Sequence, residues 1–392
     1  MRDRRVDAQL NAQGRTEHTE GAVGMRQAGS TVARGVWLLV VGAAATVSWG
    51  AGAAAQATVA GGNVIAGDVV AVGDGRPLAY ATIIVEPGMH QRFADAGGSF
   101  SVGPLPAGTY YLRVRQIGFA AHDTIVAVSD KSPTAPIRIA LRVVALRLPP
   151  VTIVGAWPTA CVSPGIPDST VNPSLAGVFA ELQKNVDRYR LLIDEYPFAF
   201  SREEWGVRRN GAGYEQTYKL DTVRYEVQEM ESRQYTPGKV VVWDLGSNGG
   251  ARHQYVPLPT FRYLGDSVFK STHCFDYMGV DTAGGTEEIR VDFRPAAAIH
   301  TPDLEGSVYL DADRYIVRRA EFRITEPDRI VPPISELSVT TTFREIVPLV
   351  PLFDEVRYRQ PTYKTGQAAT MEVDRLLAFK FEHGAPGAHL QQ

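Results

Sequence analysis

Apolar and polar residues alternate along most of the chain after residue 58, as they do in β-strands that bury one face. Between residues 58 and 145 the alternating runs are short and are separated by turns rich in glycine and proline, such as Asp74–Gly75. In one of these runs Tyr110, Leu112 and Val114 share a face, while Tyr111 lies on the opposite face. The pattern predicts a small β-sandwich in this part of the chain.

A different periodicity begins after Pro173. Apolar residues from Leu175 to Leu192 recur at steps of three and four, and Pro197 interrupts the pattern. Ser174 is the predicted N-cap, because serine side chains accept hydrogen bonds from the first backbone amides of helices. The spacing therefore predicts one amphipathic helix that packs against a sheet.

Alternation returns after Glu203 and continues to the end of the chain, which predicts an antiparallel sheet. The clearest part is a hairpin from Gly306 to Phe322 that turns through Asp311–Arg314. The predicted strands are Tyr214–Tyr218, Val223–Val227, Lys239–Trp243, Phe261–Leu264, Ile289–Phe293, Glu305–Leu310, Tyr315–Ile324, Leu337–Phe343, Asp354–Arg359 and Ala369–Phe381. The fold class is mostly β: a sandwich, then one helix and a curved antiparallel sheet, with residues 173–392 forming the helix-and-sheet domain.

The order of turns and strands up to Phe119 resembles the carboxypeptidase regulatory-like domain, a non-catalytic module found on many exported proteins. This resemblance covers roughly residues 60–142 and implies a seven-stranded transthyretin-like β-sandwich within 58–145. The sheet domain is similar to the domain that follows this module in a group of exported bacterial proteins of unknown function. It is more loosely similar to the open curved sheets of periplasmic lipoprotein carriers. The implication is architectural, and no functional residue is transferred.

Residues 1–57 have the features of an N-terminal extension and a secretory signal peptide. Arg26 and Arg34 precede the apolar run Val36–Val47, and small residues follow at Ala53–Ala57. We expect cleavage after Ala55 or Ala57, with Met1 or Met25 as the start. The apolar run is short for a membrane span, although an uncleaved anchor remains an alternative. The protein is predicted to be exported, to be periplasmic or outer-membrane associated, and to lack a transmembrane domain once mature.

Residues 146–172 are predicted to form a linker with a short strand. Pro149 and Pro150 exclude a regular helix, whereas Val151–Val154 can pair as a strand. The only two cysteines, Cys161 and Cys274, are predicted to form a disulfide, because an isolated pair in an oxidising compartment is usually bridged. Two buried thiols remain the alternative.

The search for catalytic chemistry gives a negative result. None of the 8 histidines is followed by glutamate at the His-x-x-Glu spacing of zinc carboxypeptidases. The chain also lacks the nucleophile elbow, the phosphate-binding loop and the dinucleotide fingerprint. His273–Asp276 contains a cysteine that is a weak candidate nucleophile, because the disulfide interpretation competes with it. No cofactor is predicted.

Two weaker site predictions concern a turn and an exposed aromatic ring. Asp311 and Asp313 are candidate calcium ligands, although aspartates in β-turns more often bond to nearby backbone amides. Tyr111 is a possible ligand contact, since aromatic faces stack on sugars. Tyr110 and Phe119 are the other aromatic candidates of this region, and at least half of the three are expected in the core.

These observations leave three functional hypotheses. The favoured one is a non-enzymatic cell-envelope protein whose sandwich is a binding or spacing module and whose sheet engages a partner protein or an apolar ligand. The second is carbohydrate binding through the sandwich, which also resembles starch-binding-like domains, and the third is a hydrolase with an unrecognised site. The formal net charge of -3 gives no basic footprint for nucleic acid.

Overall fold

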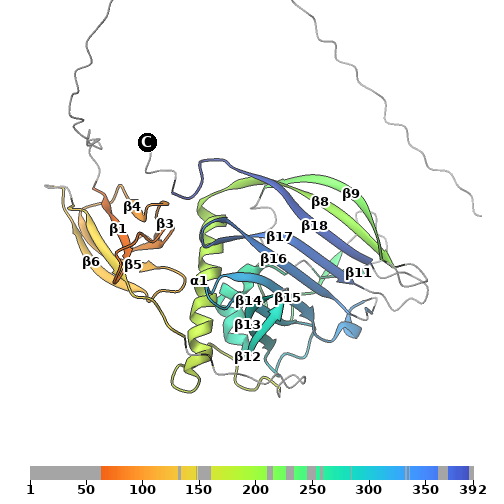
Figure 1. The fold of residues 1–392 in the computed structure, drawn as a ribbon. Helices are drawn as coiled ribbons and strands as arrows, with labels where there is room; N and C mark the ends of the chain where they lie inside the picture. Colours follow the sequence, from red (N-terminus) through yellow and green to blue (C-terminus); the bar gives the residue numbers. More distant parts are fainter. Residues whose placement is uncertain are drawn as a thin grey trace, which may run out of the picture. The chain divides into compact units, whose positions relative to one another are not determined.

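The structure is a computed structural model of the whole chain (Figure 1). It describes residues 63–130, 134–146, 148, 160–209, 215–226, 234–244, 253–256, 259–283, 285–331, 333–334, 336–360 and 370–387. The predicted signal peptide at residues 1–57 and the strand predicted at Val151–Val154 lie outside these residues.

The first seven strands form a β-sandwich, as predicted. One sheet has the order β4-β1-β7 and the other the order β3-β2-β5-β6, and β1 pairs with β7 in parallel. Alternate residues point inward: on β5, Tyr110, Leu112 and Val114 are buried. The strands are β1 (Ile65–Ala71), β2 (Thr82–Glu86), β3 (His90–Phe93), β4 (Ser99–Val102), β5 (Gly108–Arg115), β6 (His122–Val128) and β7 (Ile137–Leu141).

The predicted helix is α1 (Pro173–Glu195), but its N-cap differs from the prediction. The Asn172 side chain accepts a hydrogen bond of 3.0 Å from the backbone N–H of Leu175, so Asn172 is the cap and Ser174 lies inside the first turn. Pro173 occupies the first turn, where the backbone N–H that proline lacks would have no partner within the helix.

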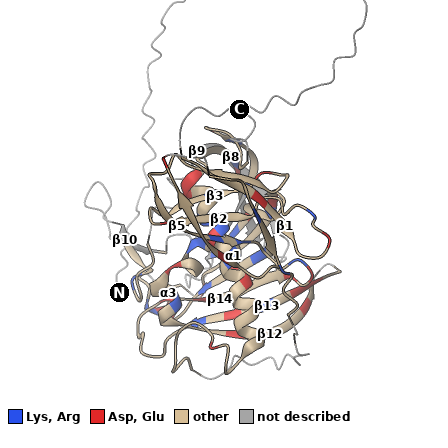
Figure 2. Ribbon diagram, turned by 90° about the vertical axis from the view of Figure 1, so that its left-hand side faces the viewer, with Lys and Arg blue, Asp and Glu red and all other residues tan. Residues whose placement is uncertain are grey.

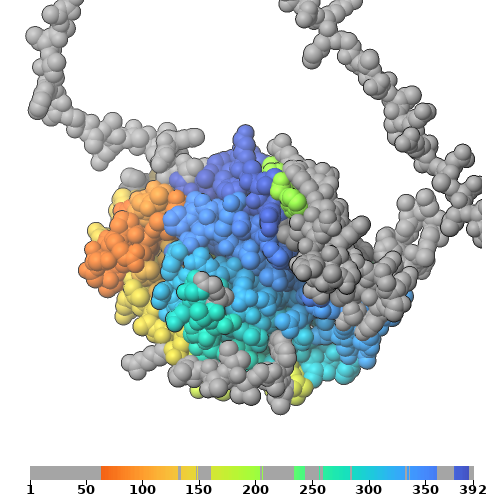
Figure 3. Space-filling view, turned by 45° about the vertical axis from the view of Figure 1, so that its right-hand side comes forward, coloured from red at the N-terminus to blue at the C-terminus, as the bar shows by residue number. Residues whose placement is uncertain are grey.

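The C-terminal domain is built on a nine-stranded antiparallel sheet with the order β12-β13-β14-β15-β16-β17-β18-β8-β9, drawn as a curved layer in Figure 1. Its core joins the sheet to α1, with Phe179 against Phe275 and Tyr189 against Phe343. In Figure 3 the last strands form one continuous blue surface. The strands are β8 (Phe198–Arg209), β9 (Glu215–Glu226), β12 (His273–Ala283), β13 (Thr286–Pro295), β14 (Leu304–Asp311), β15 (Val317–Ile324), β16 (Ser338–Val347), β17 (Val350–Gln360) and β18 (Thr370–Phe381).

The smaller elements correct more than one predicted strand. Of Lys239–Trp243, only Val242 and Trp243 belong to a strand. Phe261–Leu264, predicted as a strand, belongs to the 3-10 helix η1 (Phe261–Gly265). The other small elements are β10 (Val242–Asp244), which pairs with β11 (His253–Tyr255), together with α3 (Ser267–Thr272) and η2 (Pro327–Arg329). Within the described ranges, no helix is both long enough and apolar enough to cross a membrane.

Candidate functional site

Helix α1 carries a polar stripe on a face that is buried rather than exposed. We define the stripe as Glu181, Lys184, Asn185 and Arg188, which are spaced by three and four residues and are therefore neighbours on one side of the helix. All four are buried, with Arg188 only 1% exposed, and several of their hydrogen bonds go to the sandwich. Figure 2 shows basic and acidic positions together along α1.

The first part of the stripe binds the loop that follows β5. Glu181 and Lys184 form a buried ion pair with a distance of 2.7 Å between Oε1 and Nζ. Glu181 Oε2 also accepts the backbone N–H of Gly118, and Lys184 Nζ donates to the carbonyl of Phe119. Burial lowers the pKa of Lys184, whereas the adjacent Glu181 carboxylate opposes this shift. The two charges therefore neutralise each other, and their hydrogen bonds hold the sandwich loop against the helix.

Arg188 lies deeper in the same contact, and among the described residues no carboxylate is hydrogen-bonded to it. Its Nε donates to the carbonyl of Leu349 at 2.7 Å, its Nη1 donates to Gln116 Oε1 at 3.0 Å, and its guanidinium lies 5.0 Å from the centre of the Phe93 ring. Nη2 is buried without a hydrogen-bond partner. Burial lowers the pKa of Arg188 to about 9, with Glu345 opposing the shift, so the side chain keeps its charge at pH 7.

A cavity of about 310 Å³ opens between the sandwich and α1. The sandwich contributes residues of β2, β3, β5 and the β2–β3 turn, and the helix contributes residues between Asp187 and Glu195. The lining residues are Thr82, Ile84, Met89, Gln91, Arg115, Asp187, Arg190, Leu191, Asp194 and Glu195. This volume lies at the lower end of the range of small-ligand sites.

A second cavity of about 270 Å³ lies beside Tyr235 in the C-terminal domain. Its wall is largely aromatic and aliphatic, with Lys239 as the charged member; the lining residues are Gln234, Tyr235, Thr236, Lys239, Val240, Val242, Tyr263 and Leu304. The turn Thr236–Lys239 shapes this wall. Gly238 has φ +63°, and a Cβ there would lie 2.2 Å from Thr301 Oγ1, so the position requires glycine.

The carboxylate of Asp303, behind this cavity, is occupied by structural hydrogen bonds. It accepts the hydroxyl of Tyr235 at 2.9 Å, the backbone N–H of Gly238 at 2.8 Å and the backbone N–H of Leu304 at 2.7 Å. Burial, and then the charge of Asp303, raise the pKa of Tyr235 far above its ordinary value, which keeps the phenol protonated. The pair therefore holds the cavity wall in place rather than supplying an acid or a base.

His273 is also buried beside Asp303, and both of its ring nitrogens face backbone carbonyls. Nδ1 lies 2.9 Å from the oxygen of Phe269, and Nε2 lies 3.0 Å from the oxygen of Leu304. The ring stacks on Phe269 with 3.7 Å between the ring centres. Burial lowers the pKa of His273, although Asp303 and the two carbonyls oppose the shift. Neither nitrogen is available to a ligand.

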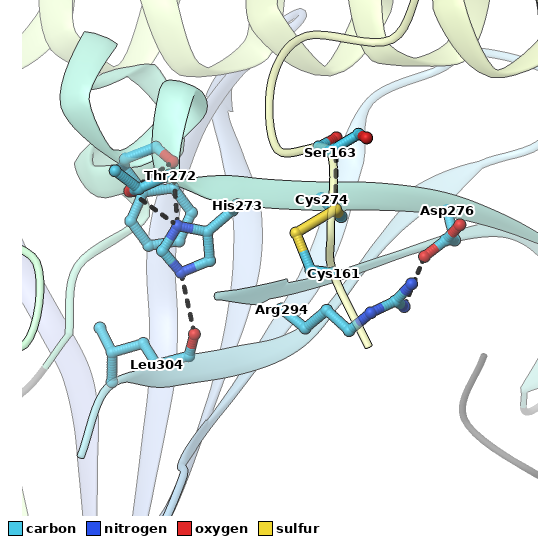
Figure 4. The surroundings of a disulfide bond; sticks show 9 residues. Cys161, Ser163, Thr272, His273, Cys274, Asp276, Arg294 and Leu304 are labelled. Carbon is cyan, nitrogen blue, oxygen red and sulfur yellow. Dashed lines mark hydrogen bonds and ion pairs between the residues drawn. A yellow bond between two sulfur atoms is a disulfide. The ribbon is translucent and has the colours of Figure 1, made fainter. Parts of the chain in front are cut away.

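The predicted disulfide between Cys161 and Cys274 is present (Figure 4). It joins the segment before α1 to the edge strand β12, where the carbonyl of Ser163 also lies 3.5 Å from the sulfur of Cys274. The thiol required by a cysteine nucleophile is therefore absent. Asp276, the last residue of that candidate motif, pairs instead with Arg294 at 2.6 Å.

Asp311 has the role of a turn residue. Its carboxylate accepts the backbone N–H groups of Asp313 and Arg314 and pairs with Arg318 at 2.6 Å. These bonds hold the β14–β15 turn, and they use the oxygens that a calcium ion would need. Among the described residues, no three His, Cys, Asp or Glu side chains are grouped closely enough to hold a metal.

Tyr111 lies on the outer face of the sandwich and is 61% exposed, whereas Tyr110 and Phe119 are buried in the sandwich core, as expected for at least half of the three. Ile125, directly opposite on β6, has the same exposure. Tyr111 is therefore accessible to a ligand, and its role in carbohydrate binding stays a prediction.

The structure brings none of the predicted site residues next to either cavity, and sequence reasoning missed Arg188, Tyr235 and Asp303.

Comparisons with known proteins give low similarity for the whole chain. A search of curated proteins finds no match. Similar solved structures include a LolA superfamily protein from Nitrosomonas europaea, at 9% identity over 52% of this chain and 94% of that chain, with a TM-score of 0.28. A putative outer membrane lipoprotein-sorting protein domain from Vibrio parahaemolyticus has 14% identity, the same coverage and a TM-score of 0.25. At such scores, function has to be inferred from the residues of the chain itself.

The family comparison is specific to the sandwich. A family model described as the Carboxypeptidase regulatory-like domain matches residues 64–142, which span β1 to β7. This match confirms the resemblance that the sequence suggested, and the matched family is regulatory-like rather than catalytic. The chain therefore carries a carboxypeptidase regulatory-like domain at residues 64–142, followed by a helix and a nine-stranded antiparallel sheet.

Proposed function

We propose that the protein is a non-enzymatic binding protein of the cell envelope, in which the sheet domain takes up an apolar ligand in the cavity beside Tyr235. The regulatory-like sandwich serves as a binding or spacing module. The signal peptide predicted at residues 1–57 supports export, with the periplasm or the outer membrane as the destination that we propose.

The observation that carries this proposal is the chemistry of the cavity wall. The aromatic and aliphatic side chains of Tyr235, Tyr263 and Val240 line it, and such walls are typical of sites for apolar ligands. The nearby groups that would otherwise supply acid–base chemistry, Asp303 and His273, are buried in hydrogen bonds with the protein. A largely apolar wall, beside which Asp303 and His273 are engaged in hydrogen bonds with the protein, favours binding over catalysis.

The proposal is tested with N-phenyl-1-naphthylamine, a neutral probe whose fluorescence rises in apolar surroundings. The full chain is expected to bind this probe saturably. Val240→Glu places a carboxylate on the cavity wall, and it should weaken binding by at least about tenfold, because an ionised carboxylate is costly to desolvate.

The matched control is Val280→Glu on β12, where the native side chain is 41% exposed and lies outside the cavity. This variant should bind the probe like the native chain, and far-ultraviolet circular dichroism should confirm that both variants fold. Equal affinities of the two variants, or no saturable binding by the native chain, would contradict the proposed function.

A further inference from the structure

The cavity beside Tyr235 has an apolar part and a polar part. The apolar part of its wall is buried or half-buried and consists of Tyr235, Val240, Val242, Tyr263 and Leu304. The remaining residues of the wall are exposed to solvent, and they are Gln234, Thr236 and Lys239. The polar side chains therefore lie at the mouth of the cavity. An apolar interior with a polar mouth suits an amphipathic ligand.

Lys239 gives this mouth a positive charge. It is the charged residue among those that line the cavity, and within the described residues no carboxylate belongs to the wall or is bonded to the Lys239 ammonium group. Asp303 lies nearby but outside the wall, and its oxygens accept the hydroxyl of Tyr235 and two backbone N–H groups. The described wall thus offers a cation that is free to pair with a ligand.

The backbone that carries Lys239 is fixed in place. The N–H of Lys239 donates to the carbonyl of Thr236 at 3.1 Å, which closes the turn. The N–H of Gly238 donates to the carboxylate of Asp303 at 2.8 Å, and the hydroxyl of Thr301 donates to the carbonyl of Gly238 at 3.2 Å. The turn is therefore set before a ligand binds, so only the lysine side chain has to be ordered.

We propose that the ligand of this cavity is a monoanionic amphiphile of the medium-chain fatty acid class. Its chain lies against Tyr235 and Val240, and its carboxylate lies at the mouth beside Lys239. This inference rests on the proposed function, and it adds the charge and the size of the ligand.

Ligands with other head groups fit the cavity less well. A cationic head would meet Lys239 without a carboxylate in the described wall to neutralise it. A neutral alcohol would hydrogen-bond to Gln234 or Thr236 but would leave the lysine charge unpaired, whereas a carboxylate accepts from all three side chains. The volume of about 270 Å³ suits one short chain rather than the two chains of a diacyl lipid.

The test uses octanoate, 1-octanol and octylammonium, which have the same number of carbons and are anionic, neutral and cationic at neutral pH. Each competes with N-phenyl-1-naphthylamine for the native full chain. Octanoate should displace the probe at a concentration at least about threefold lower than octanol, and octylammonium should be the weakest competitor. Lys239→Met should remove the advantage of octanoate and leave octanol unchanged, and Lys239→Glu should make octylammonium the strongest competitor.

The matched control is Lys380→Met on β18, which removes an exposed lysine outside the cavity and should keep the native order of the three competitors. A native chain that binds the naphthylamine probe but does not prefer octanoate to octanol would overturn this inference and leave the proposed function standing. A preference that persists in Lys239→Met would also overturn it. If the probe itself does not bind saturably, the proposed function fails, and this inference fails with it.

Discussion

His273 makes a residue-scale contribution to stability that depends on pH. Its pKa in the folded chain is lowered by burial, whereas the unfolded chain has the ordinary value near about 6.5. Near and below that pH, His273 binds a proton more readily in the unfolded state than in the folded state. The free energy of unfolding should therefore fall as the pH decreases from 7 to 5. The expected slope from this group is at most about 1.4 kcal/mol per pH unit.

Urea unfolding of His273→Gln between pH 7 and 5 measures this contribution, and the variant should show a flatter dependence than the native chain. His383→Gln, which removes an exposed histidine whose side chain is 77% accessible, is the matched control for the loss of a histidine. If the native protein became more stable on acidification, the imidazolium form would be the one held between the carbonyls of Phe269 and Leu304.

The buried polar stripe of α1 shows why sequence reasoning could not find the contact between this helix and the sandwich. Glu181, Lys184, Asn185 and Arg188 have the spacing of the polar face of an amphipathic helix, which ordinarily faces water. Only the position of the sandwich buries them. A periodic pattern reports which side of the helix is polar, but it carries no signal about a second domain that covers that side.

The N-cap of α1 gives a direct prediction about the free energy of unfolding. Asn172→Ala removes the acceptor for the Leu175 amide and should lower the free energy of unfolding by about 1 kcal/mol. Asn172→Asp should retain most of the stability, since a carboxylate is favourable at a helix N-terminus. Ser174→Ala, measured by the same urea unfolding, should cost less than Asn172→Ala; the reverse order would restore Ser174 as the cap.

Strand patterns predicted the sheet domain well where alternation was strict, as in the hairpin of β14 and β15. They failed at Phe261–Leu264, which forms part of a 3-10 helix. Phe261, Tyr263 and Leu264 are all buried there, so their apolar pattern does not identify a strand. They also missed β8 and β12, although Phe198 and Phe200 alternate at the start of β8. The many charged residues later in β8 obscured a signal that those two aromatics contained.

At the scale of the whole molecule, the disulfide joins parts of the chain that are 113 residues apart. The closed loop contains α1 and the strands β8 to β11, so the bond restricts a large share of the unfolded chain. The segment it holds also hydrogen-bonds beside β12, through the N–H of Ala297 to the carbonyl of Cys161 and the N–H of Gly165 to the carbonyl of His273. Removing the bond should therefore destabilise the fold and loosen the cover of this sheet edge.

The double variant Cys161→Ala with Cys274→Ala should have a free energy of unfolding about 2–5 kcal/mol below that of the native chain. Dithiothreitol should lower the stability of the native chain toward that of the variant and leave the variant unchanged, which separates loss of the bond from loss of side-chain packing. Equal stability of native chain and variant would mean that the contacts of α1 with the sheet hold this segment without the bond. In that case the disulfide would add little to the fold, even though it closes so long a loop.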